Sequence, residues 1–252
     1  MGGHSHWSQV KRQKGASDAK RGQIFTKLGR EIMIAAREGG GDPAMNPRLR
    51  LALLKARDNN MPADTVDRAI KRGTGQLEDA KQLIGTTFEG YGPGGVAIMV
   101  DVVTDNRNRA VAALRTAFSR GGGSLGESGC VAWQFDNKGL ILIEASDSDP
   151  EEIALMAIDA GAEDVEIGDN RVEVHTAPES LESVRRALEE MEVSVASADL
   201  SMLPKSTITL DDKQAGQVLR LLDNLEELDD VQRVYSNADF PDEVLAEYAS
   251  GS

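Results

Sequence analysis

From residue 86 onward the chain repeats one pattern: two apolar strands joined by a short turn, then an amphipathic helix. In the first copy, strands near 86–89 and 96–103 flank the turn Gly-Tyr-Gly-Pro-Gly-Gly, and a helix begins near Asn106. Parallel doubly wound folds need a helical crossover between successive strands, and consecutive hairpins argue against them. The pattern therefore predicts an α+β fold of small layered sheets with helices on one face.

The pattern continues to residue 235. Strands at 130–135 and 140–143 are predicted to turn at Asn137-Lys138-Gly139, and Asp149-Pro150-Glu151-Glu152 begins a helix with a capping-box arrangement. A further hairpin is predicted to turn at 168–170. The remaining predicted elements are, in order, a helix marked by Leu181, Val184, Leu188 and Met191, strands at 193–200 and 207–210, a helix marked by Val218, Leu221, Leu222, Leu225 and Leu228, a strand at 231–235 and a frayed tail.

Residues 1–75 are predicted to be helical. With Ser17 as N-cap, apolar residues recur at helical spacing up to a stop at Gly39-Gly40-Gly41. Two shorter helices follow, at 47–58 and 62–72, each with proline in its first turn. At about 100° per residue, four cations of the first helix fall within an arc of roughly 100° beside its apolar stripe. They are Lys20, Lys27, Arg30 and Arg37.

The charge is divided unevenly along the chain. Residues 1–75 hold 15 Lys and Arg against 7 Asp and Glu, a net charge of +8, whereas the other 177 residues hold 13 against 35, a net charge of −22. A basic segment on an acidic body is typical of nucleic-acid-binding proteins, although a solvated helical face would give the same count. Because the acidic body repels phosphate, we expect nucleic-acid contacts mainly in the first third of the chain.

The composition argues against several classes of protein. The single cysteine, Cys130, allows no internal disulfide, as expected in a reducing compartment. No run of about eighteen apolar residues is present, and the N-terminus lacks the apolar stretch of a signal peptide. The first 17 residues are basic, as in a mitochondrial presequence, but have no apolar helical face. The sequence therefore predicts a cytoplasmic protein with no membrane partner.

No arrangement of residues typical of an enzyme or a cofactor site is evident. His4 and His6 form an H-x-H pair, but His175 is the only other histidine, so no cluster has metal-ligand spacing. The Gly-rich segment 121–129 lacks the lysine of a GxxxxGK[ST] loop. Cys130 has no basic sequence neighbour, which favours a half-buried strand cysteine over a nucleophile. We predict a protein that is not an enzyme and has no cofactor, metal or small-molecule substrate.

Seven blocks of the sequence, spread over essentially the whole chain, carry a family resemblance. They are GHSHW (3–7), RGQIFTKLGREI (21–32), AAREGGGDP (35–43), NPRLR (46–50), NMPADTVDRAIKRG (60–73), FEGYGPGGVAIMVDVVTDNRNR (88–109) and GGSLGESGCVAWQF (122–135). These blocks resemble the YebC family, which includes the mitochondrial translational activators of cytochrome oxidase. Two positions depart from the family pattern: His6 stands where a lysine is usual, and Cys130 where a small polar residue is common.

The resemblance implies three domains and a role in gene expression. A helical N-terminal domain takes 1–80, a discontinuous ferredoxin-like α/β domain takes 81–129 and 203–240, and a second ferredoxin-like domain, 130–202, is inserted into it. Residues 241–252 form a tail. The family is widely described as DNA-binding transcriptional regulators, and other members resemble ribosome-associated translation factors that ease synthesis through proline-rich stretches.

Two parts of the chain are candidate nucleic-acid sites. The basic N-terminal arm, residues 4–22, is expected to become ordered when it binds a phosphate backbone. Trp7 is expected either to stack on a base or to pack on the helical domain. The second is 105–109, expected beside the Gly-rich segment 121–129, whose glycines allow close approach of a ligand; a helix start with solvated arginines is the alternative. The predicted contact residues are His4, His6, Trp7, Lys11, Arg12, Lys14, Lys20, Arg21, Lys27, Arg30, Arg107 and Arg109.

Several functions fit these residues. The chain could be a DNA-binding transcriptional regulator, a translation factor that binds ribosomal RNA, or a structural protein that binds another protein through its acidic body. Segment 62–72 makes a poor recognition helix for sequence-specific DNA binding. Separate contact patches on a multi-domain body suit an irregular RNA. We therefore favour translation, with ribosomal RNA or DNA and the ribosome as expected partners.

Overall fold

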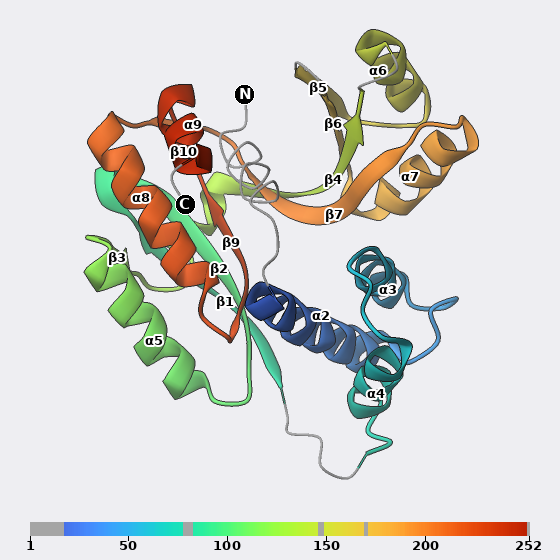
Figure 1. The fold of residues 1–252 in the computed structure, drawn as a ribbon, viewed down its shortest axis with the longest axis horizontal. Coiled ribbons are helices and arrows are strands. Elements are labelled where there is room, and N and C mark those ends of the chain that lie inside the picture. Colours follow the sequence, from blue (N-terminus) through green and yellow to red (C-terminus); the bar gives the residue numbers. More distant parts are fainter. Residues whose placement is uncertain (1–17, 78–82, 146–148, 169–170, 251–252) are drawn as a thin grey trace. The chain divides into compact units, whose positions relative to one another are not determined.

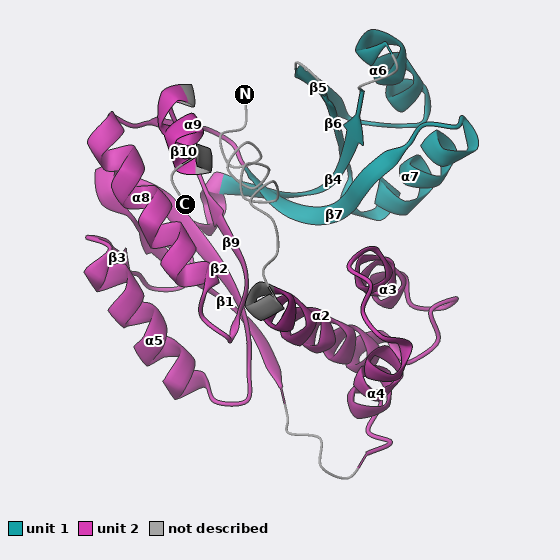
Figure 2. Cartoon of the chain, in the orientation of Figure 1, with its two compact units in different colours: residues 1, 135–203 teal, residues 2–134, 204–252 magenta. Residues whose placement is uncertain are grey.

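The computed structural model describes residues 18–77, 83–145, 149–168 and 171–250. These divide into two compact units (Figure 2): the smaller is 135–203, and the larger contains the described residues before and after it. Helices come first and sheets with helices follow (Figure 1). The predicted α+β class is therefore confirmed.

Three helices form the N-terminal part of the larger unit: α2 (Asp18–Gly39), α3 (Pro47–Asp58) and α4 (Ala63–Gly73). They match the predicted three-helix unit. Asn46 caps α3, because its side-chain oxygen accepts the Leu49 N–H at 3.0 Å while its amide donates to the Ala35 carbonyl of α2 at 2.8 Å. The predicted apolar stripe of α2 is buried in this bundle through Leu28, Ile32, Ala35 and Ala36.

A four-stranded sheet forms the centre of the larger unit. Its order is β3 (Ser124–Leu125), β1 (Ile84–Tyr91), β2 (Ala97–Thr104) and β9 (Val231–Ser236). The predicted first hairpin is confirmed, since β1 pairs antiparallel with β2 around the 3-10 turn η1 (Pro93–Gly95). A separate pair of short parallel strands joins β8 (Ile208–Thr209) to β10 (Ala238–Asp239).

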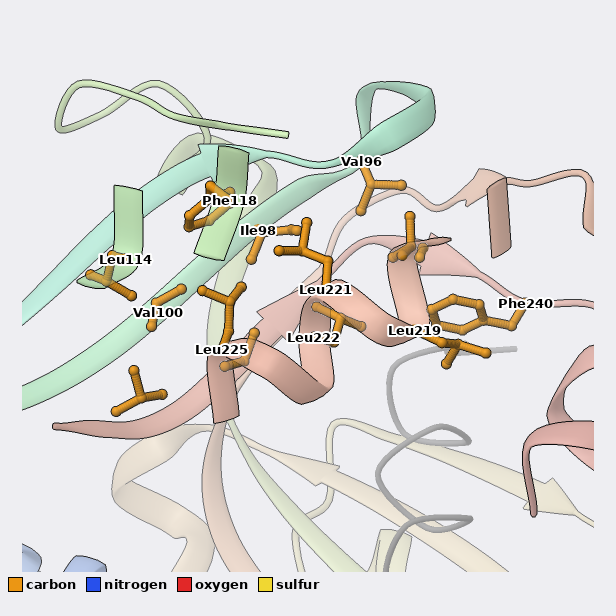
Figure 3. Packing of buried hydrophobic residues seen from close by; sticks show 14 of the residues in the cluster. Val96, Ile98, Val100, Leu114, Phe118, Leu219, Leu221, Leu222, Leu225 and Phe240 are labelled. Atoms are coloured by element: carbon orange, nitrogen blue, oxygen red, sulfur yellow. The ribbon is translucent and has the colours of Figure 1, made fainter. Parts of the chain in front are cut away.

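Two helices, α5 (Arg107–Arg120) and α8 (Asp212–Glu226), cover one face of this sheet. Alternate residues of β2 point to them, as a strand's two-residue period requires. Figure 3 shows how side chains of β2, α5 and α8 converge into one apolar core. Aliphatic residues dominate this core, and the labelled side chains are Val96, Ile98, Val100, Leu114, Phe118, Leu219, Leu221, Leu222, Leu225 and Phe240.

The smaller unit has the strand and helix order βαββαβ. Its elements are β4 (Phe135–Glu144), α6 (Pro150–Asp159), β5 (Asp164–Gly168), β6 (Arg171–Thr176), the 3-10 turn η3 (Pro178–Ser180), α7 (Leu181–Glu190) and β7 (Val195–Pro204). The sheet order β5-β6-β4-β7 is that of a ferredoxin-like fold. The hairpin predicted to turn at 168–170 is confirmed by the Gly168–Arg171 pair, although residues 169–170 lie outside the described residues.

The hairpin predicted at Asn137-Lys138-Gly139 is wrong. Residues 132–134 form a 3-10 turn, η2 (Ala132–Gln134), and β4 runs unbroken through the predicted turn. Gly139 pairs with Thr176 of β6, and a Cβ at Gly139 would lie 2.2 Å from the Thr176 hydroxyl oxygen. The glycine is therefore explained by close strand packing and not by a turn.

The frayed tail predicted after residue 240 is also wrong. The chain forms a helix, α9 (Asp242–Ser250), because Leu245 enters the main core with only 2% of its surface exposed. The Tyr248 hydroxyl donates to the Asp223 carboxylate of α8, which holds the same helix in place.

Candidate nucleic-acid interface

The predicted basic flank of α2 contacts the larger unit's own chain. Lys27 Nζ donates to the Glu226 carbonyl at 2.7 Å, and Arg30 donates to the Asp229 carbonyl and pairs with the Asp230 carboxylate at 3.3 Å. These carbonyls belong to the end of α8 and the turn after it, where helical C-terminal carbonyls lack partners. Two of the predicted contact residues, Lys27 and Arg30, therefore anchor α2 to the segment between α8 and β9.

Asp230 joins Arg30 to a second predicted residue, Arg109. The Arg109 guanidinium donates to the Asp230 carboxylate at 3.0 Å and to Asp105 at 2.7 Å. The Thr104 hydroxyl donates to the same buried Asp230 carboxylate at 3.1 Å. The hydrogen bonds to Asp230 and then to Asp105 raise the pKa of Arg109. The structure thus brings Arg30 and Arg109 together around one carboxylate, which neutralises part of their charge.

Arg107 and Gly121, the first residue of the Gly-rich segment 121–129, lie at opposite ends of α5. The helix runs unbroken over 14 residues from Arg107 to Arg120, a length of about 20 Å at 1.5 Å per residue. The Arg107 guanidinium, however, stands 5.9 Å from the centroid of the Phe88 ring, a cation–π distance, and the next residue of β1, Glu89, accepts the Gly126 N–H through its carbonyl oxygen. The expectation that 105–109 lies beside the Gly-rich segment therefore stays a prediction.

Asp230, Arg30 and Arg109 also line an open pocket of about 800 Å³. Its apolar lining includes Met33, Ala110 and Ala113, and its polar lining includes Arg37 and Arg72 beside the arginines already described. Arg37 of α2 donates to the Leu83 carbonyl at the start of the sheet. This size is typical of ligand pockets, but the partners of Arg30, Arg37 and Arg109 show that three of its four arginines already serve the fold.

The last two turns of α4 carry three exposed cations that are absent from the predicted contact residues. Arg68, Lys71 and Arg72 have the i, i+3, i+4 spacing that places side chains on one helical face, and none forms an ion pair with another described residue. We call these three residues the α4 ridge. That spacing was the signal in the sequence that could have revealed them.

Glu89 holds the segment after the Gly-rich run. Its buried carboxylate accepts backbone N–H groups from Gly129, Val131 and Ala132, at 2.6, 2.8 and 2.8 Å. Burial alone would raise the pKa of Glu89, but the three N–H donors outweigh it and the pKa is lowered. Glu89 was not among the predicted residues, because a carboxylate in a strand carries no local signal of its distant partners.

The glycines of this region pack against the protein's own backbone. A Cβ at Gly123 would lie 2.4 Å from the Tyr91 carbonyl oxygen, and one at Gly90 would lie 2.6 Å from the Ser124 carbonyl oxygen. These glycines allow β1 and β3 to meet. The close approach predicted for a ligand is, at these two positions, an approach of the chain to itself.

The remaining predicted contact residues are less fully described. Six of them lie outside the described residues, and the side chain of Lys20 in α2 is not described either. Arg21 is exposed in the first turns of α2. The six outside are His4, His6, Trp7, Lys11, Arg12 and Lys14.

Within the described part of the chain, no group of three or more His, Cys, Asp or Glu side chains is placed to hold a metal ion. Among the same residues, no helix is long and apolar enough to cross a membrane.

Comparison with known proteins gives consistent matches along the chain. Residues 5–76 match the model of the TACO1/YebC N-terminal domain, and residues 84–238 match that of the TACO1/YebC second and third domain. A probable transcriptional regulatory protein of Dehalococcoides mccartyi is 55% identical over 250 residues, which cover 99% of each chain. Another, from Moorella thermoacetica, is 54% identical over 97% of this chain and 98% of its own.

A solved structure agrees with these matches. The crystal structure of a conserved hypothetical protein from Aquifex aeolicus is similar with a TM-score of 0.84 and 45% sequence identity, over 90% of this chain and 94% of that one. Family models and relatives together cover nearly all of the sequence. The chain therefore belongs to the TACO1/YebC family.

Proposed function

We propose that the chain is a non-catalytic, cytoplasmic, nucleic-acid-binding regulator of gene expression that acts in translation, where it binds ribosomal RNA and eases stalled synthesis. The relatives named above are probable transcriptional regulatory proteins, which supports a regulator of gene expression. Their name also makes a DNA-binding transcriptional regulator the alternative. The preference for translation over transcription rests on where exposed basic side chains lie along the chain.

The observation that carries the proposal is that the basic surface is interrupted. Lys27 and Arg30 contact the chain itself, whereas the α4 ridge is exposed and without carboxylate partners among the described residues. Duplex DNA has about one charge per 1.7 Å of axis and is held best by a continuous basic face. A short ridge next to residues 76–252, which carry a net charge of −22, favours a target that meets it locally, as a folded RNA does.

The N-terminal arm supplies the second set of contacts in this proposal. Lys11, Arg12 and Lys14 bind phosphate, and Arg21 continues the basic surface into α2. Substituting the three arm residues with alanine is expected to weaken binding to all sequences alike. The slope of log K against log salt should fall by about one for each phosphate that the arm no longer neutralises. An unchanged slope in the triple variant would remove the arm from the interface.

The test of the proposed function is a paired titration at about 0.15 M salt. A folded ribosomal RNA fragment and a duplex DNA of random sequence are titrated with the full-length chain in one buffer. We expect the RNA to bind at least about ten times more tightly. Tighter binding of the duplex would favour the transcriptional alternative.

A further inference from the structure

Two aromatic side chains of the larger unit are exposed although aromatic residues make up only 4% of the sequence. Trp133, in η2, has 68% of its surface exposed, and Tyr91, at the end of β1, has 36%. Trp133 is one of only two tryptophans in the chain. Large aromatic rings usually lie in cores or interfaces, so this exposure needs a physical reason.

Both rings are tethered through their polar atoms to one carbonyl. The Tyr91 hydroxyl donates to the Cys130 carbonyl oxygen at 2.9 Å, and the Trp133 indole N–H donates to the same oxygen at 3.1 Å. The hydrogen-bonding edge of each ring is therefore occupied by the protein. What remains for a partner is the flat apolar face, which recognises by stacking.

The segment that carries Trp133 is held in place by contacts within the protein itself. The Glu89 carboxylate accepts the N–H groups of Val131 and Ala132 at 2.8 Å, immediately before Trp133. The Gly126 N–H donates to the Glu89 carbonyl at 2.8 Å, and a Cβ at Gly126 would lie 2.5 Å from the Cys130 sulfur. Tight packing and these hydrogen bonds hold both rings in place, so binding costs little conformational entropy.

We propose that Tyr91 and Trp133 form a stacking platform for an unpaired base of RNA. This inference rests on the proposed function and adds a site to it that lies apart from the cations of α2 and α4. Every base has a π-face, so a platform whose polar edges are already engaged binds bases with little sequence preference. It also discriminates against duplexes, whose bases are already stacked on each other.

Fluorescence tests the platform directly, because the chain has two tryptophans. In the Trp7→Phe variant, Trp133 is the only tryptophan and its emission reports on that ring alone. Titration with a short single-stranded RNA is expected to quench this emission saturably, with a midpoint that matches binding measured independently. A duplex RNA of the same sequence is expected to leave the emission unchanged.

Substitution of the ring provides the matched measurement. Trp133→Leu is expected to lower affinity for the single-stranded RNA by about tenfold or more, while Trp133→Tyr retains most of it. Leu155→Ala, which removes another exposed apolar side chain, is the control and should change nothing. Urea unfolding of Trp133→Leu should match that of the wild type, which separates an effect on binding from an effect on folding.

The outcomes separate the platform from the proposed function. Binding of the RNA with unchanged Trp133 emission and unchanged affinity in Trp133→Leu would overturn the platform and leave the proposed function intact. No binding of folded or single-stranded RNA by the wild type would overturn both. If Trp133→Leu weakened binding to intact ribosomes but not to RNA, the platform would contact a ribosomal protein, and the assignment to a base would be wrong.

Discussion

Glu31 shows how much of α2's polar surface serves the fold. Its carboxylate pairs with Lys55 of α3 at 3.0 Å and with Arg233 of β9 at 3.3 Å, which ties the helical bundle to the sheet. Burial alone would raise the pKa of Glu31, but Arg233 and Lys55 outweigh it and lower the pKa from 4.5 to about 2. The ionised carboxylate is therefore stabilised by the fold.

This lowered pKa predicts a pH-dependent stability. A shift of this size stabilises the folded state by at most about 3 kcal/mol above pH 4.5, and the contribution is lost as the pH falls from there toward 2. Glu31→Gln should therefore lower the free energy of unfolding at pH 7 by up to that amount. At pH 3 the difference between wild type and variant should be clearly smaller. Urea unfolding at the two pH values measures both, and a difference that does not shrink at pH 3 would count against the ion pairs.

Two glycines in the larger unit predict opposite effects of the same substitution. A Cβ at Gly123 would lie 2.4 Å from the Tyr91 carbonyl oxygen and 3.2 Å from the Gly92 Cα, both backbone atoms that a side chain cannot push aside. At Gly216, within α8, a Cβ would meet nothing within 4 Å. We expect Gly123→Ala to destabilise the fold by about 2 kcal/mol or more, and Gly216→Ala to stabilise it by about 0.5–1 kcal/mol. Thermal or urea unfolding of the two variants measures both changes in stability. Equal changes in Gly123→Ala and Gly216→Ala would mean that the segment 121–129 packs loosely against β1.

Among the helices and strands, local patterns predicted most elements and failed where distant contacts decide. The apolar stripe of α2, the prolines that open α3, and the hairpin of β1 and β2 are all local signals, and each element formed as expected. The turn signal at 137–139 misled because Gly139 is required by its neighbour Thr176 in β6. No local pattern could show that Lys27 and Arg30 would contact the end of α8 and the turn after it, about 200 residues away.

The candidate site was less predictable than the fold for the same reason. The charge division of the sequence drew attention to the basic residues, but which of them remain exposed depends on their tertiary partners. Arg109 is drawn to Asp230, and the α4 ridge lacks such a partner among the described residues. The platform of Tyr91 and Trp133 depends on Glu89 and Cys130, which no sequence spacing connects to it.

The helix α9 provides a test of the corrected C-terminus. Leu245 is buried in the core formed with α8, whereas Leu155 of α6 has a similar side chain that is 69% exposed. We expect Leu245→Ala to lower the free energy of unfolding by about 2–3 kcal/mol, and Leu155→Ala to change it by less than about 0.5 kcal/mol. A small effect of Leu245→Ala on the free energy of unfolding would instead support the frayed tail that the sequence predicted.

Across the full chain, the charge layout separates a small binding surface from a large acidic one. The α4 ridge and the N-terminal arm carry the cations of the proposed interface, whereas the residues beyond 75, with a net charge of −22, contribute the platform of Tyr91 and Trp133, which stacks on a base and needs no phosphate contact. Two variants with the same change in net charge separate the effect of the α4 ridge from the effect of net charge. One converts Arg68, Lys71 and Arg72 to glutamate, and the other converts Arg115, Arg120 and Arg220, which are also exposed in the larger unit.

Co-sedimentation with ribosomes at about 0.15 M salt, beside a titration of random duplex DNA in the same buffer, distinguishes the proposed role in translation from a role in transcription. The wild type and the Arg115, Arg120 and Arg220 variant should sediment with ribosomes and bind the duplex only weakly. The α4 ridge variant should remain in the supernatant. Nanomolar binding of the duplex by the wild type, with no ribosome association, would contradict the proposal and favour a role in transcription.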